Sequence, residues 1–111
     1  MATEIKKHVL LTQQANEFVY SQPLPVIGEL LALFSELEKH GRLERPRAEK
    51  VEGRDNLFEI RVKVAPNQYR AFYCYATEDK IFILSGFIKK TQKTPVQEIR
   101  KALKIRKELG I

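Results

Sequence analysis

Four basic residues in the second half of this 111-residue chain have the types and spacing that phosphate chemistry requires. They are Arg61 and Arg70, in two successive segments of mixed apolar and polar residues, and Lys89 and Lys90, at the end of a third. A guanidinium group stays charged, and its planar fork can bind two phosphate oxygens at once. A lysine that is desolvated among other cations can lose its proton and act as an acid or a base. These four residues are therefore the candidate catalytic residues.

Four neighbouring polar residues extend this group toward a longer phosphate backbone. Lys93 adds a cation, Thr91 and Gln92 offer hydrogen-bonding groups, and Lys63 follows Arg61 by two residues. Because alternate residues of a strand share a face, Lys63 and Arg61 should point the same way. We expect these four residues to bind phosphate or bases, although stabilisation of a turn explains Thr91 and Gln92 equally well.

The excess positive charge lies entirely in the last 23 residues. Residues 1–88 hold 12 basic and 12 acidic side chains, whereas residues 89–111 hold 8 basic and 2 acidic ones, which accounts for the net charge of +6. A cationic segment of this kind binds phosphates with release of counterions, and it steers encounters with nucleic acid. The alternative is a solvated helix face that keeps the protein soluble, which is the commoner role of a lone basic helix.

The composition excludes several other kinds of site. Cys74 is the only cysteine, and the five glycines are dispersed, so neither a disulfide, a cysteine zinc site nor a glycine-rich phosphate loop is expected. No residue cluster has metal-ligand spacing, and we therefore expect no metal or cofactor. His8 and His40 have ordinary structural interpretations beside a strand and at a helix end. The chain lacks a signal-peptide-like start and an apolar run of about 18 residues, which predicts a soluble cytoplasmic protein without membrane partners.

Hydrophobic patterning predicts one α+β domain over residues 1–111 that would position these side chains. Apolar residues at three- and four-residue steps from Ile27 to Leu37 indicate a helix that Gly41 ends. Alternation over 57–64 indicates a strand with one face on the helices and one polar face, while the apolar run 80–88 indicates a strand covered on both sides. The predicted order is β-α-α-β-β-β-α. We expect a strand at 7–12, helices at 13–21 and 27–40, a loop at 42–56 with a short strand near 48–51, strands at 57–64, 69–75 and 80–88, and turns at 65–68 and 77–79. A final helix should follow, with Thr94 as N-cap, Pro95 as its first residue and Gln97 completing a capping box.

Several segments together carry a more specific pattern. They are Leu57–Val62, Gln68–Tyr73 and Ile83–Pro95, the last containing the run Gly-Phe-Ile-Lys-Lys-Thr-Gln-Lys-Thr-Pro, followed by Glu98, Ile99 and Ala102. Over about residues 12–109 the sequence resembles the phage-derived, HigB-like branch of the RelE/ParE toxin superfamily of type II toxin-antitoxin systems. The resemblance implies a RelE-like, microbial-RNase-like fold, in which an antiparallel sheet packs on an N-terminal helical hairpin beside a C-terminal helix. It also implies a cognate antitoxin and, in many members, cleavage of mRNA in the ribosomal A site.

Metal-independent RNA cleavage needs a proton acceptor, a proton donor and cations on the developing phosphorane charge, and these cations often contribute most to the rate enhancement. The resemblance therefore suggests Arg61 and Arg70 as transition-state contacts, with Lys89 and Lys90 in the same field. Members of the superfamily often carry a catalytic tyrosine or histidine near the C-terminus, whereas this chain ends in Arg-Lys-Glu-Leu-Gly-Ile. The general base is thus unidentified, with Tyr69 as one alternative.

Local alternatives remain for each of these assignments. Arg61 can instead form an ion pair with Glu59 or with an acid on a neighbouring strand. Whether Arg70 shares a face with Arg61 depends on a hairpin register that patterning does not determine. If the strand continues through Lys89 and Lys90, only one of the two lysines faces the site.

The resemblance favours a ribosome-dependent mRNA endoribonuclease that inhibits translation. The alternatives are a ParE-like gyrase poison that cuts no RNA, and a degenerate toxin that only binds DNA or its antitoxin. We expect a helix-turn-helix antitoxin to form a hetero-oligomeric complex with this chain, covering the cationic sheet surface or packing beside the last helix with acidic residues against 89–107.

Overall fold

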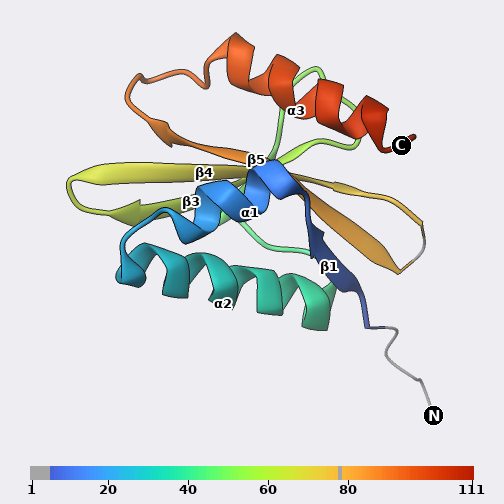
Figure 1. Cartoon of the computed structure of the whole chain (residues 1–111), viewed down its shortest axis with the longest axis horizontal. Coiled ribbons are helices and arrows are strands. Elements are labelled where there is room, and N and C mark those ends of the chain that lie inside the picture. The colour runs from blue at the N-terminus through green and yellow to red at the C-terminus, as the bar shows by residue number, and fades with distance from the viewer. Residues whose placement is uncertain (1–5, 78) are drawn as a thin grey trace.

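The structure is a computed structural model that describes residues 6–77 and 79–111, and it has a mixed sheet at its centre (Figure 1). The strand order is β1-β5-β4-β3-β2; β1 runs parallel to β5, and the other neighbours are antiparallel. The elements are β1 His8–Leu11, α1 Gln13–Tyr20, α2 Leu24–His40, β2 Ala48–Lys50, β3 Phe58–Val64, β4 Asn67–Tyr75, β5 Lys80–Lys89 and α3 Val96–Glu108. The predicted α+β class is confirmed. β2 is the short strand expected near 48–51, which the predicted order β-α-α-β-β-β-α did not count, and the parallel pairing of β1 makes the sheet mixed rather than antiparallel.

Helices α1 and α2 cover one face of the sheet. Thr12 caps α1 by accepting the Ala15 N–H at 3.1 Å, and α2 ends at Gly41, whose φ of +74° is the left-handed conformation that glycine adopts without strain. Contrary to expectation, α2 already begins at Leu24, with Pro25 in its first turn. Proline is tolerated there because the first N–H groups of a helix have no intrahelical acceptor.

The core beneath these two helices is mostly apolar. Leu30 and Leu37 of α2 pack with Ile60 of β3 and Tyr73 of β4, and all four side chains are buried. Full burial of each such side chain contributes roughly 1.5–3 kcal/mol relative to exposure. The alternation predicted for 57–64 is therefore confirmed, with the even-numbered residues of β3 facing α1 and α2.

Helix α3 covers part of the opposite face, as Figure 1 shows. Its Ala102 and Ile105 are buried against Phe72 and Leu84, so β5 is covered from both sides as predicted. Leu109, just after the end of α3, is exposed. Among the described residues, no helix is both long enough and apolar enough to cross a membrane.

The start of α3 differs from the prediction. The helix begins at Val96, Pro95 occupies the N-cap position, and no side chain caps it. Thr94 instead donates its hydroxyl to Oε2 of Glu59 at 2.8 Å. The predicted capping box with Gln97 is wrong because a carboxylate from the sheet, a stronger acceptor than a backbone carbonyl, takes the threonine hydroxyl.

The two hairpin turns connect β3 to β4 and β4 to β5. The first is tighter than expected, since β4 starts at Asn67 and Val64 already pairs with it. The second was predicted at 77–79; Glu78 lies outside the described residues, and the Lys80 N–H donates to the Thr77 carbonyl at 3.1 Å.

Candidate phosphate-binding site

The register of the β3–β4 hairpin brings the two candidate arginines together. Arg61 is the direct cross-strand partner of Arg70, so both side chains lie on the face that α3 partly covers. This settles the open question of whether they share a face. Like charges directly opposite each other in a sheet are destabilising. The pair therefore needs compensating negative charge.

Glu59 supplies that charge from within the same face. Its Oε1 lies 3.4 Å from Nε of Arg70 and 3.5 Å from Nε of Arg61, while its Oε2 accepts the Thr94 hydroxyl. Only 4% of Glu59 is exposed. A carboxylate this buried is stable only where cations or donors satisfy its oxygens. Glu59 therefore anchors both arginines and the loop before α3.

Arg70 is the most buried cation of the site, with 7% of its surface exposed. Its Nη2 donates to Oε1 of Gln68 at 2.8 Å. Burial lowers the pKa of Arg70 from its ordinary value, the Glu59 carboxylate opposes this shift, and the Arg61 guanidinium adds to it. Arginine remains charged in spite of such shifts because its ordinary pKa lies far above neutral pH. Arg70 is thus a fixed, permanently charged group.

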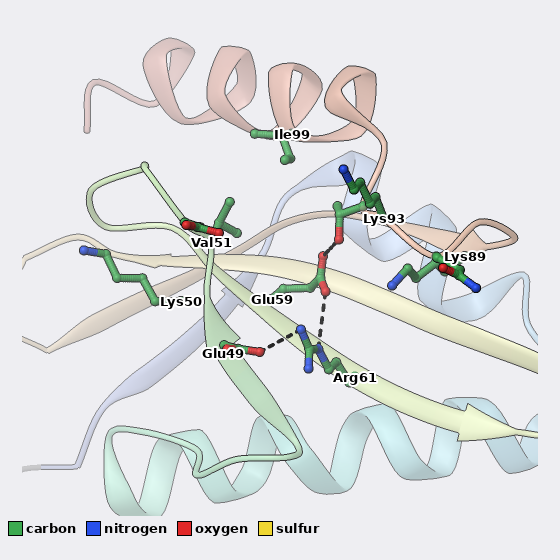
Figure 2. A pocket seen from close by; sticks show the side chains of 11 residues that line it. Glu49, Lys50, Val51, Glu59, Arg61, Lys89, Lys93 and Ile99 are labelled. Carbon is green, nitrogen blue, oxygen red and sulfur yellow. Dashed lines mark hydrogen bonds and ion pairs between the residues drawn. The ribbon is translucent and has the colours of Figure 1, made fainter.

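Arg61 lies nearer the rim and contacts a second carboxylate (Figure 2). Its Nη2 is 2.8 Å from Oε2 of Glu49, on the edge strand β2. The other oxygen of Glu49 is 2.9 Å from Nη2 of Arg45. The alternative of an ion-paired Arg61 is therefore realised in this structure, with Glu59 and Glu49 as its partners.

An open pocket of about 470 Å³ extends from this arrangement to the start of α3. Two smaller hollows, of about 430 and 370 Å³, adjoin it and share lining residues with it. Glu49, Glu59, Arg61, Lys89, Lys93 and Thr94 are among the residues that line the first pocket, and the labelled side chains of Figure 2 surround it. Together the three hollows bring charged and polar side chains into one continuous area of this face.

The predicted lysines lie in or beside these hollows. Within residues 6–77 and 79–111, Lys63, Lys89, Lys90 and Lys93 form no ion pair. Lys89 ends β5 opposite Gln68, which places it on the face of the arginines, and it is half-buried and lines two hollows. Lys90 is exposed and lines only the second. Of the two, Lys89 is the better candidate for the site.

The remaining predicted phosphate ligands lie at the rim. Gln92 is exposed and lines the first two hollows, and Lys63 lines the third together with both arginines. Thr91 donates its hydroxyl to the Lys93 carbonyl at 2.7 Å. The turn-stabilising interpretation of Thr91 therefore describes this structure, although its side chain is exposed.

Other residues considered from the sequence lie elsewhere. Tyr69 is buried in the core beneath α1 and α2, on the opposite face, so it packs in the core and does not line the site. His8 on β1 and His40 at the end of α2 are exposed, and neither lines a hollow that contains Arg61. Cys74 packs under α3, where burial raises the pKa of its thiol to about 11.

Two functional candidates were missed by sequence reasoning. Glu59 was considered only as a competitor for Arg61, although its position two residues earlier in the strand places it on the same face. Its central role follows from contacts with Arg70 and Thr94, which are distant in sequence. No sequence pattern pointed to Glu49, because it lies in a polar segment. The pairing of β2 with β3 brings its side chain to Arg61.

The chain is similar to phage-derived proteins and to RelE structures. The family model "Phage derived protein Gp49-like (DUF891)" matches residues 17–107. No curated protein matches the chain. A double arginine-to-alanine variant of the E. coli toxin RelE, in the free state, aligns with a TM-score of 0.67 at 18% identity over 89% of this chain and 96% of that one.

Two further solved structures have the same fold. RelBE2, a toxin-antitoxin complex from Mycobacterium tuberculosis, gives a TM-score of 0.58 at 17% identity, covering 77% of this chain and 100% of that one. An archaeal RelE-RelB complex from Pyrococcus horikoshii gives 0.55 at 23% identity, covering 80% and 99%. The predicted RelE-like fold is therefore confirmed.

Proposed function

Because the chain belongs to the phage derived Gp49-like family and has a RelE-like fold, we propose that it is the toxin of a type II toxin-antitoxin system, of the HigB-like branch. Its proposed activity is ribosome-dependent cleavage of mRNA, which would inhibit translation in the cytoplasm. A cognate antitoxin would neutralise it. The proposal is consistent with the similar structures, one of which is a toxin and another a toxin-antitoxin complex.

The observation that carries the proposal is the cross-strand pair Arg61 and Arg70 around the buried Glu59. Two guanidinium groups on one rigid sheet surface are suited to the equatorial oxygens of a pentavalent phosphorus. Lys89 and Lys63 continue the positive charge on either side. A single-stranded phosphate backbone would lie along the three hollows, with Lys90, Thr91, Gln92 and Lys93 contacting its neighbouring phosphates or bases.

In the proposed reaction, the ribose 2′-oxygen attacks the adjacent phosphorus and the bond to the 5′-oxygen breaks. The 2′-hydroxyl proton passes to an acceptor, and the leaving 5′-oxygen takes a proton from a donor. Glu59 is our candidate acceptor, because it lines the pocket beside Arg61 and lies within 3.5 Å of both guanidinium groups. Lys89, half-buried beside them, is our candidate donor. The products would be a 2′,3′-cyclic phosphate and a 5′-hydroxyl end.

The test is a bacterial translation extract to which the purified protein is added. We expect new mRNA 5′ ends inside the coding sequence, and none when initiation is blocked. The double variant Arg61→Gln, Arg70→Gln should cut at least about a hundredfold more slowly, since losing one transition-state donor costs about 10²–10³ in rate. A matched variant, Arg42→Gln with Arg54→Gln, removes two exposed arginines outside the site and should cut normally.

The alternatives give different results in the same extract. Cleavage that both double variants perform equally well would remove the arginines from the site. Intact mRNA together with altered DNA topoisomers would select a gyrase poison. Intact mRNA and unaffected translation would select a non-catalytic binding protein.

Antitoxin binding forms a separate part of the proposal. An acidic helix or extended segment of a helix-turn-helix partner would lie against the exposed cations between Lys89 and Lys107. Arg100, Lys101 and Lys104 of α3 are all exposed and are available for this contact. Charge reversal at these three residues should weaken the complex and its dependence on salt. A complex that is indifferent to both changes would contradict this placement.

A further inference from the structure

Glu49 divides its carboxylate between a cation inside the pocket and a cation outside it. Oε2 contacts Arg61 at 2.8 Å, and Oε1 contacts Arg45 at 2.9 Å. Arg61 and Glu49 line the first pocket, whereas Arg45 is highly exposed and does not line it. The carboxylate therefore bridges the site and the solvent-facing side of β2.

The ion pair with Glu49 occupies the Arg61 guanidinium, which the proposed function assigns to phosphate binding. A phosphate that binds Arg61 would meet the negative charge of Glu49 on the same guanidinium. The side chains of Arg61 and Glu49 are 37% and 32% exposed, so their ion pair is screened by solvent and weak enough to exchange. Glu59, in contrast, is buried and also held by Arg70 and Thr94.

We propose that Glu49 is an internal competitor that a substrate phosphate must displace from Arg61, and that Arg45 retains the displaced carboxylate. This inference rests on the proposed function insofar as the ligand is the phosphate of single-stranded RNA. Glu49 thereby sets a threshold for occupancy of Arg61. A single weak anion would leave the ion pair intact, whereas a backbone held at the same time by Lys89 and Lys63 would replace it.

The location of β2 permits this exchange. The strand has three residues, lies at the edge of the sheet and pairs with β3. A side chain at such an edge can change its rotamer without disturbing the buried core. Because Glu49 can keep Arg45 as its partner, its displacement leaves no carboxylate unpaired.

The test measures binding of a ten-nucleotide, fluorescein-labelled RNA whose 2′-hydroxyls are all methylated, so that it cannot be cleaved. Glu49→Gln should bind this RNA about fivefold more tightly than wild type, the most that an exposed ion pair typically opposes. Its salt dependence should steepen by about 0.7 in log–log slope, because one more cation is free to release a counterion. Arg45→Gln should bind about twofold more weakly, because Glu49 then has only Arg61 as a partner.

The Arg42–Glu44 pair provides matched controls, because both side chains are highly exposed and neither lines the pocket. Glu44→Gln and Arg42→Gln report the effect of the same charge changes away from Arg61. In the Glu49→Gln background, Arg45→Gln should have no more effect than Arg42→Gln does. Since the two single variants act in opposite directions, a general loss of folding cannot produce both results.

The outcomes separate this inference from the proposed function. If Glu49→Gln binds no more tightly than Glu44→Gln, the competition is refuted. The nuclease assignment is not, because it depends on cleavage in the translation extract. If Glu49→Gln binds more tightly and no mRNA is cut in the extract, the competition stands and the nuclease assignment fails. If no variant binds the RNA at low salt, the competition is overturned, and cleavage in the extract alone decides the nuclease assignment.

Discussion

Replacement of Glu59 by glutamine should destabilise the folded protein by about 3 kcal/mol, because it leaves the Arg70 guanidinium buried without a counter-charge. Glu59 is 4% exposed and Arg70 is 7% exposed, so water cannot replace the lost carboxylate. Breaking a buried ion pair costs about 3–5 kcal/mol. The lower end applies here, since Gln68 remains as an acceptor for Arg70 and the new amide can still accept the Thr94 hydroxyl.

This loss should be visible as a large shift of the melting temperature. An unfolding entropy of about 2.1 cal/mol/K per residue corresponds to about 0.23 kcal/mol/K for this chain, so about 3 kcal/mol lowers Tm by about 13 °C. Urea titration followed by circular dichroism gives the free energy of unfolding directly. Glu44→Gln is the control, since its side chain is 69% exposed and pairs with Arg42. We expect it to change stability by less than about 0.5 kcal/mol.

The double variant Glu59→Gln, Arg70→Met tests the cause of the loss. If the cost comes from an uncompensated buried charge, removing that charge should recover at least about 1 kcal/mol relative to the sum of the single variants. Two results would refute the reasoning. One is a Glu59→Gln variant as stable as Glu44→Gln, and the other is strict additivity in the double variant.

Two further predictions concern the core on either side of the sheet. A Cβ atom on Gly86 would lie 2.2 Å from Cδ2 of Phe18, so Gly86→Ala should lower the free energy of unfolding in urea by about 2–3 kcal/mol. The loss should be smaller in a Phe18→Leu background. An equal loss in both backgrounds would contradict this explanation. Burial raises the pKa of Cys74 from 9.0 to about 11, so the unfolded chain releases this proton first and stability should fall as pH rises from about 9 to 11. Cys74→Ala should remove that part of the fall between pH 8 and 10.5, and an unchanged pH profile would disprove the assignment.

The elements that local patterning determines could be predicted well from the sequence. The apolar steps of α2 and the alternation of β3 follow from the periods of a helix and a strand, and each is visible within one segment. The family pattern likewise lies in contiguous runs. The start of α3 could not be predicted in this way, since Thr94 had a local role as N-cap and a distant one at Glu59. A local rule cannot weigh an acceptor 35 residues away.

In the candidate site, too, the sequence identified the residue types but not the contacts that the fold gives them. Sequence identified Arg61 and Arg70 as cations suited to phosphate, but a one-residue slip of the β3–β4 register would have sent Arg70 to the other face. That register also forces two guanidinium groups together, and their repulsion is relieved by Glu59 from the same strand and by Glu49 from β2. A preformed pair of cations on a folded sheet must be compensated by anions until its ligand arrives. If Arg61 binds phosphate as we propose, binding exchanges one anion for another, and its strength depends on the carboxylate that leaves as much as on the arginine that stays.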